Sequence, residues 1–167
     1  MNIKAKAVTL AVGLAIPTVG YFEGRSLLAY LDPVGIPTIC DGWTNGVKLG
    51  DTATPAQCDQ WTIQGLEEAE RIFDQAVPKP ARSNISPTTK AGFLSFIYNV
   101  GPGKPGIKDG FLWLKNGRNS TMVRLLREGR VAEACQQFPA WASAAGKRLK
   151  GLVLRRAAEQ RLCEAGL

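Results

Sequence analysis

The chain has 167 residues, of which 45% are hydrophobic and 21% charged, a balance typical of one globular domain with a hydrophobic core. It contains no histidine, which excludes catalysis by an imidazole base and metal sites built from histidine. Neither Gly103-Lys104 nor Gly146-Lys147 continues with Ser or Thr, so a G-x-x-x-x-G-K-[ST] phosphate loop is excluded as well. If the chain is an enzyme, we expect carboxylates to transfer its protons, without a metal or cofactor.

The formal net charge of +7 is unevenly distributed. Residues 1–78 carry five basic and nine acidic side chains, whereas residues 79–167 carry sixteen basic and five acidic ones. A basic half suits a polyanionic partner such as nucleic acid, an anionic membrane surface or an acidic wall polymer, and it equally suits a solvated face. An alternative function is that of a cationic membrane-disrupting protein, which would act through the basic segment from Lys147 to Arg161. We expect no nucleic acid partner, because no binding motif with interleaved aromatic residues accompanies the charge.

The N-terminal segment has the pattern of an export signal. Lys4 and Lys6 precede residues 7–22, which are sixteen residues without a charge. A stable membrane anchor needs roughly twenty strongly apolar residues, so this segment is short and mild. It can be a cleaved signal peptide, a buried helix of a soluble protein, or a weak anchor that is exported uncleaved and later leaves the bilayer. We favour the weak anchor, because cleavage after Gly20 would leave only two residues before Glu23.

The next elements are predicted from turn and capping signals. Residues 30–49 mix β-branched residues with a turn at Pro33-Val34-Gly35 and a hairpin turn at Asn45-Gly46, which predicts a small antiparallel sheet. Thr54-Pro55-Ala56-Gln57 then provides an N-cap and a capping box for a long amphipathic helix over 55–76.

The rest of the chain is predicted to be mainly helical. One helix runs from Ser86-Pro87 to Gly101-Pro102, followed by a loop over 101–110. Others are expected from Ser120 to about Glu128, and over 131–138 and 148–163. The predicted fold class is α+β, with a small hairpin sheet near the N-terminus and then a mainly helical lobe.

The four cysteines are Cys40, Cys58, Cys135 and Cys163, and none belongs to a C-x-x-C motif. A zinc site would need all four from two distant regions. Of the three possible disulfide connectivities, local pairing of the first two and of the last two closes the shortest loops, and we choose it. Two bridges would indicate an oxidising compartment, which is the periplasm in a bacterial setting. Four buried thiols in a cytosolic protein are the alternative.

Glu23 and Asp32 are the candidate catalytic carboxylates. Gly24 fits a helix C-terminus, which places Glu23 in the last helical turn, where the negative end of the helix dipole disfavours its charged form. Asp32 enters a turn and should be solvated and ionised. Glycoside hydrolysis uses one protonated and one ionised carboxyl, and Thr38 offers a hydroxyl on the next strand that can hold a water. The spacing alone proves little, because such pairs occur by chance in most proteins.

Three separated stretches resemble the phage-type lysozymes, or endolysins. The spacing from Glu23 through Asp32 to Thr38 matches their catalytic residues, residues 95–101 are similar to their serine-phenylalanine…asparagine-x-glycine helix end, and residues 151–159 resemble their closing helix. The similarity covers about residues 21–163. It implies a lysozyme-like fold and hydrolysis of the β-1,4 bond between N-acetylmuramic acid and N-acetylglucosamine in peptidoglycan glycan strands, which lyses the host cell.

The resemblance also implies roles for single residues. Glu23 is the general acid, Asp32 the second carboxylate, and Thr38 helps to position the attacking water. Asn99 matches a sugar-contacting position at the edge of the cleft, or else caps the end of its helix. Arg155 is a substrate-binding candidate. Either Arg155 or Arg156 resembles a cationic partner near the catalytic glutamate, and a solvated, wall-binding face is the alternative. The cysteine positions recur in exported family members, which supports the local pairing.

One position departs from the family pattern. Trp43 replaces a histidine that phage lysozymes commonly carry after the threonine, which removes a possible ion pair. We interpret this as a matter of stability, because that histidine is not needed to move protons. The sequence leaves open whether the anomeric configuration is inverted or retained, and it does not separate hydrolysis from transglycosylation.

The N-terminus resembles the signal-arrest-release endolysins. The resemblance implies a signal-anchor segment over residues 1–22 and a catalytic domain over residues 23–167. The anchored protein would be inactive at the host inner membrane, and a monomer would act in the periplasm after release. While residues 7–22 lie in lipid, Glu23 cannot face Asp32. After escape, the segment can pack on the soluble domain and complete the cleft.

Overall fold

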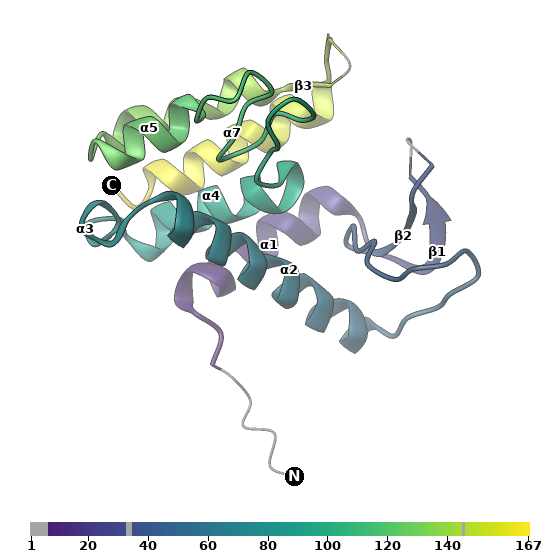
Figure 1. Cartoon of the computed structure of the whole chain (residues 1–167). Helices are drawn as coiled ribbons and strands as arrows, with labels where there is room; N and C mark the ends of the chain where they lie inside the picture. Colours follow the sequence, from purple (N-terminus) through teal and green to yellow (C-terminus); the bar gives the residue numbers. More distant parts are fainter. Residues whose placement is uncertain (1–6, 33–34, 145) are drawn as a thin grey trace.

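The computed structural model describes residues 7–32, 35–144 and 146–167. A small antiparallel sheet, β1–β2, lies at one end of the molecule, and most of the helices gather at the other end (Figure 1). The long helix α2, Pro55–Ala76, runs from the sheet into the helical lobe. The predicted α+β class, with a hairpin sheet followed by helices, is confirmed.

The apolar N-terminal segment forms a buried helix. Helix α1, Leu10–Glu23, begins at Thr9, whose hydroxyl oxygen accepts a hydrogen bond from a backbone N–H of the first turn, and packs against α2 and α4. Its buried side chains are small, namely Ala11, Val12, Ala15 and Val19. Within the described ranges, no helix is both long and apolar enough to cross a membrane. The flanking Lys4 and Lys6 lie outside the described residues.

The small sheet begins earlier than predicted. Strand β1, Ser26–Leu31, pairs antiparallel with β2, Pro37–Cys40, and Tyr30 lies opposite Thr38. The prediction of an antiparallel sheet is confirmed, but β1 starts at Ser26 and not at residue 30. The predicted turn at residues 33–35 falls partly outside the described residues.

Asn45-Gly46 forms a turn, but no named strands flank it in the described chain. The prediction of a hairpin around it was wrong. The chain turns immediately after β2, and the backbone of Trp43 pairs back onto Ile39. The backbone N–H and C=O groups of Ile39 and Trp43 bond to each other, so they cannot pair with the strands of a longer hairpin.

The helices follow their capping signals. Helix α2 has the predicted bounds and the predicted capping box of Thr54 and Gln57. Ser86 caps α4, Pro87–Val100, and Ser120 caps α5, Thr121–Arg127.

The remaining elements are shorter. Helix α3 covers Lys79–Arg82, α6 covers Val131–Cys135, and α7 covers Lys150–Glu164. The helix predicted over 131–138 ends at Cys135, and a separate 3-10 helix, η1, Phe138–Trp141, follows it. Two short strands, β3 (Ser143–Ala144) and β4 (Lys147–Arg148), form a hairpin that the sequence did not predict.

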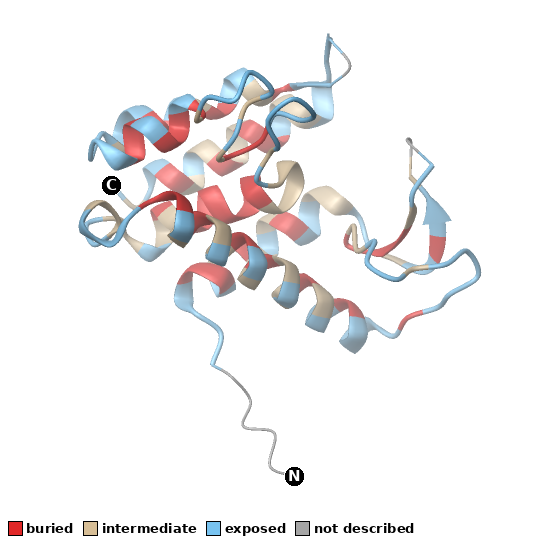
Figure 2. Cartoon of the chain, viewed as in Figure 1, coloured by how far each residue is buried: buried red, intermediate tan, exposed pale blue. Residues whose placement is uncertain are grey.

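Aromatic side chains fill the core of the helical lobe. Helix α4 is buried along much of its length (Figure 2), and five fully buried phenylalanines pack with ring centroids 5.2–6.5 Å apart: Phe73, Phe93, Phe96, Phe111 and Phe138. Each such side chain stabilises the fold by about 1.5–3 kcal/mol through burial.

Both predicted disulfides are present. Cys40–Cys58 joins the end of β2 to the first turn of α2, and Cys135–Cys163 joins α6 to α7. The local pairing is confirmed, and all four cysteines are used.

We predict that replacing Cys135 and Cys163 together by Ala lowers the free energy of unfolding by about 2–4 kcal/mol, because the unfolded chain loses a loop constraint. The measurement is urea unfolding of the oxidised proteins. In excess reductant, the gap between wild type and variant should shrink. Equal stability under oxidising conditions would contradict a stabilising role for this bridge.

Candidate active site

Glu23 is the last residue of α1 and faces both lobes. Gly24 follows it with φ 67°, which ends the helix as the sequence predicted. The Glu23 side chain is 19% exposed, and its Oε1 lies 2.5 Å from Nη1 of Arg155 on α7. A methyl group placed on Gly42 would lie 3.1 Å from Oε2, so the second oxygen faces the loop that follows β2.

Arg155 is buried beside Glu23. Its side chain is 4% exposed. It donates from Nε to Glu159 at 3.0 Å and from Nη2 to the Ser95 carbonyl at 3.4 Å. The solvated, wall-binding face considered for Arg155 does not fit this burial. The cationic partner of Glu23 does fit it.

Glu159 binds the guanidinium groups of Arg155 and Arg156. It is fully buried and accepts hydrogen bonds from Arg155, Arg156 and the Ser95 hydroxyl. Burial raises the pKa of Glu159, against the opposing charges of the two guanidinium groups, and burial lowers the pKa of Arg156. Arg156 also donates to Oδ1 of Asn99. The Asn99 side chain is therefore bonded to α7, while a backbone bond from Gly101 to Ile97 closes helix α4.

Asp32 and Thr38 are held by the same residue. The Asp32 backbone N–H donates to the Ile36 carbonyl at 3.0 Å, and Asp32 Oδ1 accepts from the Ile36 N–H at 2.8 Å. The buried Thr38 hydroxyl donates to that carbonyl at 3.0 Å. Both candidate side chains therefore belong to one hydrogen-bonded end of the sheet.

The charges of both carboxylates act on Tyr30. Burial raises its pKa, and so do the negative charges of Glu23 and Asp32. Both carboxylates therefore lie within electrostatic reach of one phenol, and Thr38 is the residue opposite Tyr30 across the sheet. Asp32 and Thr38 therefore lie at the Leu31/Pro37 end of the sheet, whereas Glu23 ends α1 and faces Gly42, which follows the Ser26/Cys40 end.

Two hollows adjoin this region. One of about 450 Å³ lies between the small lobe, α2 and the end of α4, and its lining includes Gly42, Trp43 and Tyr98. A larger one of about 850 Å³ lies in the helical lobe, and its lining includes Asn99 and Arg156. The candidate carboxylates line neither. Glu23 is connected to the smaller hollow through Gly42 and to the larger one through the Arg155–Glu159–Arg156 contacts.

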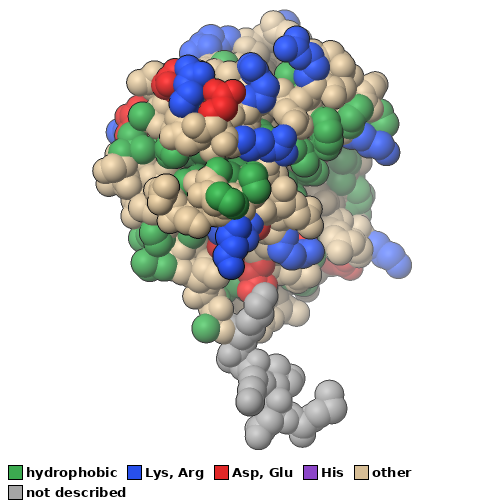
Figure 3. Space-filling view, turned by 60° about the vertical axis from the view of Figure 1, so that its left-hand side comes forward, with side chains coloured by type: hydrophobic (Ala, Val, Ile, Leu, Met, Phe, Trp, Pro, Cys, Tyr) green, Lys and Arg blue, Asp and Glu red, His purple; other side chains and the backbone are tan. Residues whose placement is uncertain are grey.

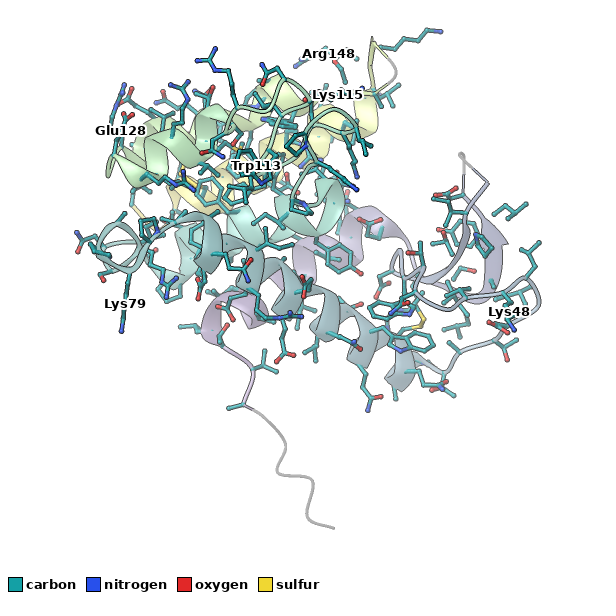
Figure 4. The ribbon with its side chains drawn as sticks, in the orientation of Figure 1. Lys48, Lys79, Trp113, Lys115, Glu128 and Arg148 are labelled. Carbon is teal, nitrogen blue, oxygen red and sulfur yellow. A yellow bond between two sulfur atoms is a disulfide. The ribbon has the colours of Figure 1, made fainter. Side chains whose placement is uncertain are left out.

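Basic side chains spread over the helical lobe. Figure 3 shows Lys and Arg distributed across one face, with Asp and Glu confined to a few places. Lys115, which lines the larger hollow, and Arg148 both lie at the upper edge of this lobe in Figure 4, whereas Lys48 lies on the small lobe. A polyanion approaching the larger hollow would therefore meet positive charge.

Several supporting residues were not assigned a role from sequence. Ser95 and Glu159 lie inside two of the motifs, but their contact with each other spans 64 residues. Asp41 was assigned no role of its own, because its partners Arg25 and Thr62 are 16 and 21 residues away. Trp43, at the departing position, stacks on Trp61 with ring centroids 5.9 Å apart.

Comparison with known proteins gives concordant matches. A family model described as phage lysozyme matches residues 20–159. The SAR-endolysin of Pseudomonas phage phiKMV is 38% identical over 167 residues, which cover 98% of this chain and 92% of that protein. The SAR-endolysin of Enterobacteria phage PA-2 is 34% identical, with 95% of this chain and 93% of that protein covered.

Solved structures share the fold. The active form of the P1 phage endolysin Lyz has a TM-score of 0.76 at 22% identity, covering 92% of this chain and 84% of that chain. A P22 lysozyme mutant has a TM-score of 0.69 at 27% identity, covering 90% and 94%. The secreted inactive form of the P1 endolysin has a lower TM-score of 0.57 at 18% identity, covering 96% and 97%.

We predict that Arg155→Met lowers the free energy of unfolding by about 3–5 kcal/mol, because it leaves buried Glu159 with one cation fewer. The change should also reduce wall-lytic activity, since Glu23 loses its partner. Urea unfolding and a wall-turbidity assay measure the two effects. Arg161→Met, an exposed change on the same helix, should stay within about 0.5 kcal/mol of wild type. Similar stability of the two variants would contradict this account.

Proposed function

The chain belongs to the phage lysozyme family, and from that premise we propose that it hydrolyses the β-1,4 bond between N-acetylmuramic acid and N-acetylglucosamine in peptidoglycan and so lyses the host cell. The observation that carries the proposal is the phage lysozyme family match over residues 20–159, a range that includes Glu23, Asp32 and Thr38. Most glycoside hydrolases use two carboxyl groups that flank the scissile glycosidic bond.

Glu23 acts as the general acid. Its Oε1 accepts the bond from Arg155, so the proton of the neutral acid resides on Oε2, and from there it passes to the leaving glycosidic oxygen. The Asp32 carboxylate stabilises the positive charge that develops on the sugar ring. Thr38 donates to the Ile36 carbonyl, and its oxygen still accepts a hydrogen bond from the attacking water.

Substrate contacts come from the two hollows. Asn99 reaches the larger hollow and contacts sugar there, with its side chain oriented by Arg156. Arg155 supports the reaction differently from a sugar-binding residue, because its guanidinium is already bonded to Glu23 and Glu159. We therefore assign it to positioning Glu23. The basic helical lobe suits the acidic groups of the cell wall.

The N-terminal segment controls when the enzyme becomes active, through its position in or out of the membrane. We propose that residues 1–22 first hold the protein inactive in the host inner membrane, and that residues 23–167 act in the periplasm after release. The similarity to SAR-endolysins supports this. In lipid, α1 is separated from α7, so Glu23 lacks Arg155. No cysteine lies in residues 7–22, so release itself is the trigger.

We predict that Glu23→Gln lowers wall-lytic activity by at least about 100-fold while leaving the melting temperature near that of wild type, because the amide cannot donate the proton. Mass spectrometry of the muropeptides released by wild type should show reducing ends. Glu164→Gln, an exposed change on α7, should remain active. Retained lysis by Glu23→Gln would indicate membrane disruption by the basic segment instead.

We predict that Gly13→Leu with Gly20→Leu retains the protein in the membrane. Both glycines are exposed on α1, and a Cβ added at either position would meet nothing within 4 Å. We therefore expect the released fold to tolerate both leucines while the anchor becomes more apolar. Cell fractionation and the onset of lysis measure the effect. The matched Gly13→Ser, Gly20→Ser protein should be released. Equal release of both proteins would contradict the anchor proposal.

A further inference from the structure

The turn after β2 has an unusual backbone. Cys40 has φ 57° and Gly42 has φ 89°, both in the left-handed region. A non-glycine residue keeps this conformation only where its surroundings determine it, and such residues are common at functional sites. The contacts around residues 40–42 must therefore hold this backbone conformation.

Three other elements hold this turn through Asp41. Arg25, just after α1, donates from Nε at 3.1 Å and from Nη2 at 2.6 Å to the Asp41 carboxylate. Thr62 of α2 donates to the same carboxylate at 2.7 Å, and the Tyr98 hydroxyl of α4 donates to the Asp41 carbonyl at 2.7 Å. The Cys40–Cys58 disulfide adds a fourth connection.

The Asp41 carboxylate is 1% exposed. Its burial opposes ionisation, but the hydrogen bonds from Arg25 and Thr62 and the charge of Arg25 outweigh that effect and lower the pKa of Asp41. Asp59, 64% exposed, is the other acidic partner of Arg25, at 2.8 Å. Asp41 is thus the buried, ionised centre of the cluster and Asp59 its exposed neighbour.

The position of the turn determines which group lies next to Oε2 of Glu23. Glu23 Oε1 is bonded to Arg155, and Oε2 faces Gly42, the residue after Asp41. Because Arg155 can only donate, a proton on the neutral acid belongs on Oε2. Gly42 therefore borders the oxygen from which the proton leaves.

We infer that Asp41 is a positioning residue for glycoside hydrolysis: together with Arg25, Thr62 and Tyr98 it fixes Gly42 against Oε2 of Glu23. This inference rests on the proposed function. Asp41 touches neither sugar nor water in the reaction, and it acts by keeping the acid oxygen in one orientation. A small misplacement of a catalytic group costs about 100-fold in rate.

The test compares Asp41→Asn with Asp59→Asn. Each removes one negative charge beside Arg25, but only the first changes the turn. On soluble glycan strands, Asp41→Asn should lower kcat by about 10- to 100-fold with KM within about twofold, whereas Asp59→Asn should leave both unchanged. Measurements are made well below the melting temperature of each variant, so that a loss of stability does not lower kcat.

Tyr98→Phe provides a second variant if Asp41→Asn does not fold, because it removes the hydroxyl that holds the Asp41 carbonyl and keeps the aromatic ring. It should lower kcat in the same direction, and the double variant should lose less than the product of the two losses. Wild-type kcat in Asp41→Asn and Tyr98→Phe, beside an inactive Glu23→Gln, would overturn the positioning role alone. An active Glu23→Gln would instead overturn the proposed function.

Discussion

The contact between Glu23 and Arg155 joins the end of α1 to α7, across 132 residues of sequence. A buried ion pair adds little net stability, but leaving one partner unpaired is costly. Arg155 is oriented by Glu159, which in turn binds Arg156 and Ser95. Glu23 therefore acquires its environment only when α1 is docked on the helical lobe, and the rest of the site depends on that docking.

Helix α1 combines two requirements. The face that packs on the lobe consists of small side chains such as Ala11 and Ala15, while Gly13, Pro17 and Gly20 are exposed. Small buried side chains contribute less hydrophobic free energy than large ones. On the proposed function, this composition keeps the segment only weakly held in a bilayer, yet still able to pack in water. One segment thus connects location with assembly of the site.

The small lobe contributes the other half of the site. Ile36 holds both Asp32 and Thr38, and the turn around Asp41 borders Glu23. Cys40–Cys58 fastens this lobe to α2, and Trp43 stacks on Trp61 where the family commonly has a histidine. Aromatic stacking at this position helps to hold the loop against α2.

The sequence by itself predicted where several helices begin, and it singled out Glu23 as the candidate acid. Capping depends on groups three or four residues apart, so Thr54, Ser86 and Ser120 predicted where helices begin, and Gly24 predicted that Glu23 ends one. Strand pairing depends on distant partners, so the hairpin expected around residues 45–46 did not form. Only the tertiary structure decided that Arg155 serves Glu23, that Arg156 holds Asn99, and that Asp41 orders a turn. These contacts join residues 16 to 132 positions apart, and packing of whole elements brings them together.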